Sequence, residues 1–200
     1  IQNDPALSGL IIQLPLPEQL YTPHVLNCID PSLDVDCLTS ENLGKLFIKA
    51  EYVVPPTPAA VMTVIHELGI DLIGKNVTVV GVGSLVGKPL TVMLMNERAS
   101  VSTVNSSTKD SAAKCLQADI IVTGVGQKNL ITAEMVHPPS IVIDTGFFFE
   151  YGKSSGDEDY DEVAPLVQAI TPTPGGIGPI TVAQLLRNTV ICAENKNPAH

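Results

Sequence analysis

The strongest structural signal in this chain is Val77-Thr78-Val79-Val80-Gly81-Val82-Gly83-Ser84-Leu85-Val86-Gly87-Lys88-Pro89. Its β-branched start is typical of a buried strand, and its glycines let a backbone turn approach a phosphate closely. The free amide groups at the start of a helix, reinforced by the helix dipole, bind an anion. The spacing Gly-x-Gly-x-x-x-Gly is one residue longer than the common dinucleotide fingerprint. We predict a dinucleotide-binding turn here, with a plain tight turn between strand and helix as the alternative.

Strands and helices alternate regularly from this segment onward. The expected strands are 76–80, 100–104, 119–123 and 140–144, and the expected helices are 88–96 and 111–116. Such alternation predicts an α/β fold, with a Rossmann-type parallel sheet and helices on both of its faces. A helix that ends at Gly69 is expected before the segment, and a final helix is expected from about Thr181 to Glu194.

The remaining segments carry weaker signals. The apolar block Gly9–Leu14 is predicted to be a buried strand, because it is short and is followed by prolines. Thr22-Pro23 is typical of a helix start, so a short helix is expected through Ile29. The proline-dense stretch 52–58 is expected to be an extended hinge. The acidic stretch 151–162 is predicted to be a solvated surface loop.

The composition excludes several classes of protein. The 200 residues are 44% hydrophobic and 16% charged, which excludes a disordered chain. The net charge of −10 has the wrong sign for a protein that holds nucleic acid through its phosphates. The apolar runs fall far short of the roughly 18 residues that a membrane helix needs. We therefore expect no nucleic-acid partner and no membrane span.

The cysteines and histidines give no sign of a metal site or a disulfide framework. They lack the spacing of metal ligands and contain no Cys-x-x-Cys pair. The residues in question are Cys28, Cys37, Cys115, Cys192, His24, His66 and His137. We expect buried thiols that behave as small hydrophobic groups, structural or surface histidines, and a reducing compartment.

A second cluster of special backbone residues, 172–181, precedes the final helix. Its three glycines stand among three prolines, which suits an exposed rigid loop against a flat ligand or a nicotinamide edge. A structural crossover turn is the alternative. The loop 105–108 offers neither a carboxylate for ribose hydroxyls nor an arginine for a 2′-phosphate, so this loop leaves the choice between NAD and NADP open. Spacing alone assigns no role to Gln13, Asp34 or Asp36.

Six segments, taken in order, resemble the bifunctional methylenetetrahydrofolate dehydrogenase/methenyltetrahydrofolate cyclohydrolase family. They are Gly-Leu-Ile-Ile-Gln-Leu-Pro-Leu-Pro (9–17), Asp-Val-Asp (34–36), Pro-Pro-Thr-Pro (55–58), Val-Gly-Lys-Pro (86–89), Gly-Asp (156–157) and Pro-Gly-Gly-Ile-Gly-Pro-Ile-Thr (174–181). The resemblance implies a Rossmann-type NAD(P)-binding domain at 58–169 and a partial folate domain at 1–57 and 170–200. It also implies oxidation of methylenetetrahydrofolate, hydrolysis of the methenyl product to 10-formyltetrahydrofolate, and a homodimer.

The resemblance also implies the site residues. Gln13 matches a glutamine that positions the catalytic lysine and the substrate, and Asp36 matches the carboxylate that grips the pterin ring. The residues implied to bind tetrahydrofolate derivatives are Gln13, Leu14, Pro15, Asp36, Pro174, Gly175, Gly176 and Pro179. The residues expected to bind the dinucleotide are Gly81, Val82, Gly83, Ser84, Val86, Gly87, Asn105, Ser106, Gly124, Thr145 and Gly146.

The chain departs from the family pattern at several positions. Val82 stands where the family has arginine, which removes a cation for a 2′-phosphate and slightly favours NAD over NADP. Asn105 stands where many members have histidine, and Cys37 replaces a glycine after the substrate carboxylate. The family's catalytic lysine lies in a Tyr-x-x-x-Lys helix upstream of the 9–17 segment, where only eight residues precede Gly9. We therefore expect the 200 residues to be an N-terminally truncated chain that lacks this lysine and has little activity.

Two other functions fit parts of the pattern. The chain could be a non-catalytic nucleotide-binding or dimerising module, which would expose the apolar surface of an incomplete folate domain. It could also be an unrelated NAD-dependent dehydrogenase, although that leaves the 174–181 segment unexplained. The expected location is cytoplasmic, with mitochondrion and plastid left open.

Overall fold

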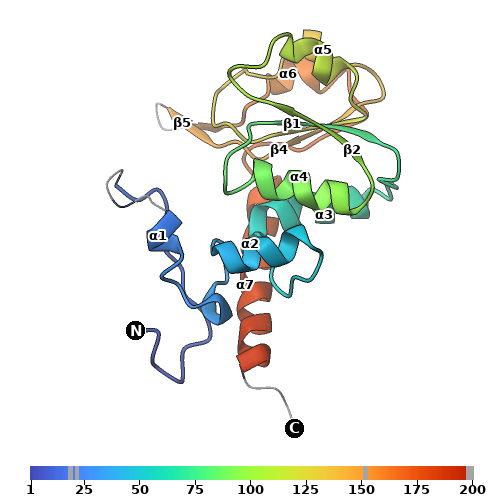
Figure 1. Cartoon of the computed structure of the whole chain (residues 1–200). Coiled ribbons are helices and arrows are strands. Elements are labelled where there is room, and N and C mark those ends of the chain that lie inside the picture. The colour runs from blue at the N-terminus through green and yellow to red at the C-terminus, as the bar shows by residue number, and fades with distance from the viewer. Residues whose placement is uncertain (18–19, 21–22, 151–152, 197–200) are drawn as a thin grey trace.

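A five-stranded parallel sheet forms the centre of the computed structural model, which describes residues 1–17, 20, 23–150 and 153–196 (Figure 1). The strands lie in the order β2-β1-β3-β4-β7, and each neighbouring pair is parallel. They are β1 (Asn76–Val80), β2 (Ser100–Val104), β3 (Ile120–Thr123), β4 (Ile141–Asp144) and β7 (Ala169–Ile170). The chain passes from β1 to β2 on one side and then to β3 on the other, so the strand order switches direction at β1.

Alternating side chains give the sheet two apolar faces. Val77 and Val79 of β1 pack into one core together with α3 (Pro56–Glu67) and α4 (Gly87–Asn96). Val80 packs into the other core, which lies against α5 (Ser111–Leu116), η2 (Ala133–Met135) and α6 (Tyr160–Val163). Helices therefore cover both faces, and the predicted α/β fold is confirmed.

The expected elements of the sheet region match the structure to within one residue. The bounds of β1, β2 and α5 are as predicted, whereas α4 begins one residue earlier and β3 and β4 begin one residue later. Gly69 has φ +69° after α3, as expected for a residue that ends a helix. The last helix, α7 (Ile177–Lys196), is longer at both ends than its pattern indicated. It is the longest helix of the described chain, but the described part contains no helix that is both long and apolar enough to cross a membrane.

Helix α7 joins the sheet to the N-terminal third of the chain (Figure 1). Its first residue, Ile177, belongs to the core on the α3 side of the sheet. Further along, Cys192 packs with Val35 and Val53 in a separate small core. Between them, the buried Asn188 donates from its Nδ2 to the carbonyl oxygens of Val35 and Val54, at 2.7 Å each. One side chain thus holds two loops against α7.

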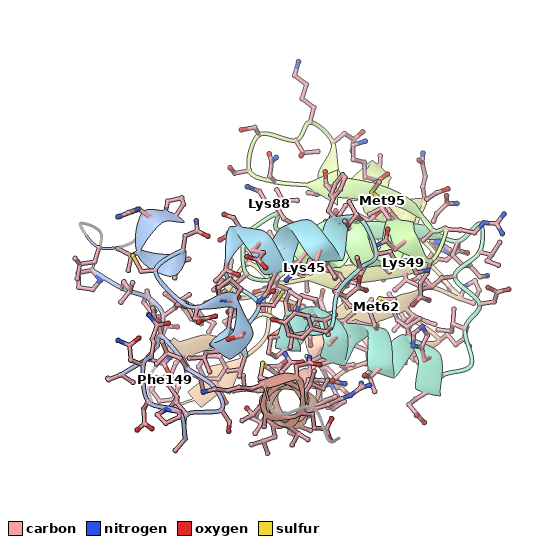
Figure 2. The ribbon with its side chains drawn as sticks, turned by 60° about the horizontal axis from the view of Figure 1, so that its bottom comes forward. Lys45, Lys49, Met62, Lys88, Met95 and Phe149 are labelled. Carbon is pink, nitrogen blue, oxygen red and sulfur yellow. The ribbon has the colours of Figure 1, made fainter. Side chains whose placement is uncertain are left out.

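The N-terminal third contains short elements around α2 (Ser40–Phe47), a helix that the sequence patterns did not predict. Thr39 caps α2 by accepting a hydrogen bond from the amide of Asn42. Before it lie α1 (Pro23–Leu26) and the 3-10 turn η1 (Pro31–Leu33). Figure 2 shows Lys88 and Met95 at opposite ends of α4, with Lys45 and Lys49 on the neighbouring α2 side. The Lys49 Nζ donates to the carbonyl of Asn96, which ties the end of α2 to the end of α4.

Five predictions about local structure need correction. The stretch 52–58 is not extended throughout, because α3 begins at Pro56. The block Gly9–Leu14 is not a buried strand: its only pairing among the described residues is the bridge from Leu10 to Asp34, and Ile11 is exposed. An apolar run becomes a strand only where a partner accepts its backbone groups. The helix expected through Ile29 ends at Leu26, and Thr22 lies outside the described residues.

The other two corrections concern burial. The acidic stretch is not a solvated loop, because it contains α6, the hairpin strand β6 (Lys153–Ser155) paired with β5 (Phe148–Glu150), and the fully buried Asp157. The cysteines were all expected to be buried, but Cys28 is exposed. It lies next to α1, away from the three cores.

The double hydrogen bond of Asn188 predicts a large stability effect. Asn188→Leu removes the hydrogen-bond donor to the carbonyl groups of the buried Val35 and the partly buried Val54, which costs about 2–5 kcal/mol of the free energy of unfolding. Urea unfolding measures it, with the exposed neighbour Arg187→Leu as the control that changes stability by roughly 0.5 kcal/mol or less. Equal losses in the two variants would show that the two hydrogen bonds of Asn188 contribute nothing to stability.

Candidate functional site

A first pocket lies where the strand order switches, at the carboxyl ends of β1, β2 and β3. Such a crevice is where open parallel sheets bind ligands. We name it the switch-point pocket; it encloses about 340 Å³. Its lining is Val80, Gly81, Val104, Asn105, Ser106, Thr108, Ser111, Val125, Gln127, Leu130 and Met135. None of these lining residues is charged, so polar recognition here depends on amides and hydroxyl groups.

The glycine turn at the edge of this pocket is too tight for side chains. Gly81 has φ +94°, and a Cβ on the buried Gly87 would overlap the carbonyl group of Gly81. The turn leads directly into α4, whose N-cap is Val86, a residue without a side-chain oxygen to cap the first amides. A helix N-terminus of this kind presents amide groups and a positive dipole end to an anion.

The loop after β2 closes on itself. The Oδ1 of Asn105 accepts from the amide of Ser107 at 2.9 Å, and its backbone amide donates to the Oγ1 of Thr108 at 2.9 Å. The exposed Asn105 and Ser106 therefore present a compact neutral turn to the pocket.

A second pocket, the loop pocket, lies beneath the glycine- and proline-rich loop and encloses about 460 Å³. One wall is 144–147 at the end of β4, and the other is 172–179 at the start of α7. Gly175 has φ +100° and open space around it, so this loop keeps its backbone accessible. The predicted site residues Thr145, Gly146, Pro174, Gly175, Gly176 and Pro179 all line this pocket.

A third pocket, the N-terminal pocket, contains Gln13, Leu14 and Asp36. It encloses about 340 Å³, and its other lining residues are mostly apolar. Thr57 and Thr181 line both this pocket and the loop pocket, and their Oγ1 atoms are 3.5 Å apart. The two pockets therefore share a wall, and ligands in them would lie next to each other.

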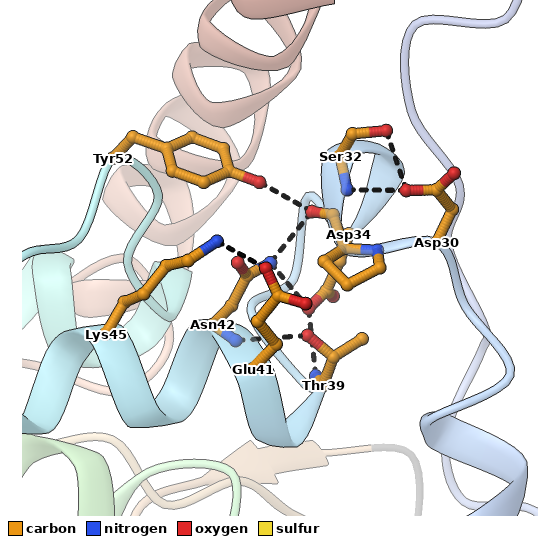
Figure 3. Close-up of polar contacts among 9 residues, drawn as sticks. Asp30, Ser32, Asp34, Thr39, Glu41, Asn42, Lys45 and Tyr52 are labelled. Atoms are coloured by element: carbon orange, nitrogen blue, oxygen red, sulfur yellow. Dashed lines mark hydrogen bonds and ion pairs between the residues drawn. The ribbon is translucent and has the colours of Figure 1, made fainter.

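The two carboxylates of the acidic pair have different surroundings, and Figure 3 shows those of Asp34. The fully buried Asp34 accepts hydrogen bonds from the amides of Leu38 and Thr39 at 2.9 and 2.8 Å, and from the Nδ2 of Asn42 at 3.0 Å. Asp36 instead lines the N-terminal pocket. Asp34 thus fixes the loop that carries Asp36, a role that spacing alone did not reveal.

Burial changes the chemistry of Asp36. Desolvation, with a smaller contribution from the Asp34 carboxylate, raises the pKa of Asp36 to about 6. The next residue, Cys37, has φ +56° and is buried. The chain therefore makes a left-handed turn here without a glycine, at a conformational cost of roughly 1–2 kcal/mol.

The structure gathers most predicted site residues at these three pockets. Gly124 lies at the end of β3, where a Cβ would overlap the side chain of Thr145. Pro15, which follows a cis peptide bond after Leu14, lines none of these three pockets. Val82, Gly83, Ser84, Val86 and Gly87 form the turn itself. Their binding roles stay predictions.

Several residues at the site had no local signal that could have found them. Thr57 and Thr181 meet only because α3 packs against α7, and Asp144 enters the loop pocket from the end of a strand. In the described residues, no group of three or more histidine, cysteine, aspartate or glutamate side chains could hold a metal ion.

The family model and the relatives with similar sequences point to the same protein family. Residues 55–197 match the family model of the tetrahydrofolate dehydrogenase/cyclohydrolase NAD(P)-binding domain. The bifunctional protein FolD of Nautilia profundicola is 46% identical over 196 residues, which are 98% of this chain and 69% of that protein. The FolD of Campylobacter curvus is 42% identical, over 96% of this chain and 67% of that protein.

Solved structures agree. The Campylobacter jejuni FolD dehydrogenase/cyclohydrolase superposes with a TM-score of 0.93 at 40% identity, covering 97% of this chain and 70% of that one. The Trypanosoma brucei FolD, complexed with NADP cofactor and an inhibitor, has a TM-score of 0.94 at 34% identity, covering 99% of this chain and 70% of that one.

The raised pKa of Asp36 predicts a pH-dependent stability difference. Since the folded state disfavours the ionised carboxylate, stability falls as the pH rises from about 4 to about 6 and is level above that. Asp36→Asn removes this loss, so the variant becomes more stable than the wild type by about 1–3 kcal/mol at pH 7 and equals it near pH 4. Urea unfolding at each pH measures the gap. The exposed Asp161→Asn is the control, and a gap that does not vary with pH would refute the account.

Proposed function

Because the chain belongs to the tetrahydrofolate dehydrogenase/cyclohydrolase family, we propose that it oxidises 5,10-methylenetetrahydrofolate with NAD or NADP and then hydrolyses the methenyl product to 10-formyltetrahydrofolate. The observation that carries the proposal is the wall that Thr57 and Thr181 share between the loop pocket and the N-terminal pocket. A hydride transfer needs two flat ligands side by side, and this shared wall gives them adjacent sites.

The described residues fit a dinucleotide. Gly83 of the glycine turn is exposed and has open space around it, so a phosphate can approach the backbone there. The switch-point pocket, beside Asn105 and Ser106, suits the adenosine end, and the loop pocket suits the nicotinamide end. When bound, the nicotinamide accepts the hydride that leaves the one-carbon bridge of the substrate.

The chain's own residues hold and orient the ligands. In the proposal, Asp36 binds the pterin ring in the N-terminal pocket, and Gln13 orients the one-carbon end of the folate. The open backbone of Gly175 and Gly176 lets the nicotinamide lie close to the folate across the shared wall. Water then adds to the methenyl carbon, one ring C–N bond breaks, and one proton is released as the formyl product forms.

We also propose a preference for NAD over NADP. Val82 stands in the turn before α4 and offers no cation to a 2′-phosphate. The lining of the switch-point pocket, as described, is neutral throughout. A charge-assisted hydrogen bond is worth about 1.5–3 kcal/mol, so the missing cation weakens NADP more than NAD.

We also propose a homodimer, a cytoplasmic location and a division into two domains. One domain is made of 1–57 and 170–200, and the other of 58–169. The exposed Phe149 supports association, because it gives apolar surface to the hairpin of β5 and β6 that projects beside the sheet (Figure 1). The small core of Val35, Val53 and Cys192 supports a second unit that is completed by α7.

Ligand titration tests the proposed function. Isothermal titration of the 200 residues is expected to show saturable binding of NAD, and weaker binding of NADP. The intact gene product, supplied with methylenetetrahydrofolate and either dinucleotide, is expected to produce the absorbance of the reduced nicotinamide. Binding without any turnover by the intact product would favour a non-catalytic module, and absence of dinucleotide binding would refute both. Low turnover by the 200 residues alone stays a prediction from the sequence.

Val82→Arg tests the cofactor preference. The new guanidinium is expected to tighten NADP about tenfold and to leave the dissociation constant of NAD within about twofold, because only NADP carries the 2′-phosphate. Val82→Gln is the matched control, since it adds a long polar side chain without charge. A similar change for both dinucleotides in the arginine variant would contradict the assignment of this turn.

A further inference from the structure

The Gly156-Asp157 segment has no role in the proposed function so far, yet it is among the most buried parts of the chain. Asp157 is fully buried, although it lies in an acidic stretch. A buried carboxylate requires several hydrogen-bond donors, because desolvation of an unpaired charge costs far more than the fold can supply. The donors of Asp157 come from the segment that follows β3.

Three donors reach the two oxygens of this carboxylate. Its Oδ2 accepts from the Oγ1 of Thr123 and from the amide of Val125, both at 2.7 Å. Its Oδ1 accepts from the amide of Gln127, also at 2.7 Å. The backbone carbonyl of Asp157 accepts from the amides of Leu130 and Ile131 at 2.6 and 3.1 Å. Asp157 therefore fixes the segment from 123 to 131 at five points.

The same segment forms a wall of the switch-point pocket. Val125, Gln127 and Leu130 line that pocket together with Asn105 and Ser106. Val125 and Gln127 are exposed, so their neighbours in the chain do little to hold them in place. The shape of this wall thus depends on a carboxylate from another part of the chain.

Asp144 connects Asp157, and the segment 123–131 that Asp157 holds, to the loop pocket. Its Oδ2 accepts from the amide of Asp157 and its Oδ1 from the amide of Gly146, at 2.6 Å each. Its own amide donates to the Oγ1 of Thr171, one residue before the glycine- and proline-rich loop. The two carboxylates pack closely against glycines, because a Cβ at Gly146 would overlap the Asp157 carboxylate and one at Gly156 would overlap that of Asp144.

We propose that Asp157 is a positioning residue for the dinucleotide, which holds the 124–127 wall of the switch-point pocket in its binding shape, and that Asp144 ties this wall to the loop pocket. The inference rests on the proposed function, since it takes the occupant of the pocket to be a dinucleotide. Asp157 touches no ligand in this account. It acts through the amides of Val125 and Gln127.

Asp157→Asn tests the proposal. An amide has one acceptor oxygen and turns an NH₂ group toward a donor, so at least one of the three hydrogen bonds from the 123–127 segment is lost. We expect the dissociation constant of NADH to rise roughly tenfold to a hundredfold. The fluorescence of the reduced nicotinamide itself reports binding directly. Asp161→Asn, an exposed acid in the same stretch, is the matched control and is expected to bind as the wild type does.

A second readout separates positioning from general loss of structure. Tetrahydrofolate binding at the N-terminal pocket is expected to stay within about twofold of the wild type. The lining of that pocket includes neither Asp144 nor Asp157, nor any residue of the segment 123–131. Amide hydrogen exchange at Val125 and Gln127 is expected to accelerate without nucleotide present. If Asp157→Asn fails to fold, Thr123→Val removes one hydroxyl donor with little change of shape and is expected to weaken NADH by a smaller factor.

The outcomes are distinguishable. Unchanged NADH binding in Asp157→Asn, beside normal binding by the wild type, overturns the positioning role and leaves the proposed function intact. Equal weakening of NADH and tetrahydrofolate also overturns it, because the residue would then be supporting the whole fold. If the wild type binds no dinucleotide, the proposed function fails and this inference fails with it.

Discussion

Parallel pairing of the strands is the constraint on which the other features of the site depend. Because β1, β2, β3 and β4 run in one direction, the turns that follow them meet at a single edge of the sheet. The glycine turn, the 105–108 loop, the 124–127 segment and the end of β4 are brought together in this way. Without that shared edge, no single feature of these loops would make a binding site.

Helix α7 connects the sheet edge to the N-terminal pocket. Its start packs with the sheet core and its later turns pack with the loop that carries Asp36, so one rigid element spans both pockets. Asn188 secures the joint by binding the carbonyl groups of Val35 and Val54. The distance between the N-terminal pocket and the loop pocket is therefore set by a helix, and Thr57 and Thr181 stand where α3 and α7 meet.

Local patterns predicted the sheet region well and the rest less well, for a physical reason. The bounds of β1 and β2 follow from their β-branched runs, and these signals are local. Burial is not local: Asp157 stands in an acidic stretch, and the donors to its side chain lie 30 to 34 residues earlier in the chain. The prediction of a buried strand at Gly9–Leu14 was wrong in the opposite sense. The block is apolar, but apolar composition does not supply a strand for it to pair with. The family resemblance located Gly156-Asp157, but only the structure indicates what the carboxylate does.

The central claim is that one continuous site holds a dinucleotide on the sheet edge and a folate across the wall made by Thr57 and Thr181. A crystal structure of the chain with NAD and tetrahydrofolate tests this most directly. The account predicts the pyrophosphate against the amides of the glycine turn, the nicotinamide beside Gly175 and Gly176, and the pterin ring against the carboxylate of Asp36. A dinucleotide bound away from the glycine turn, or a folate bound away from Asp36, would contradict it.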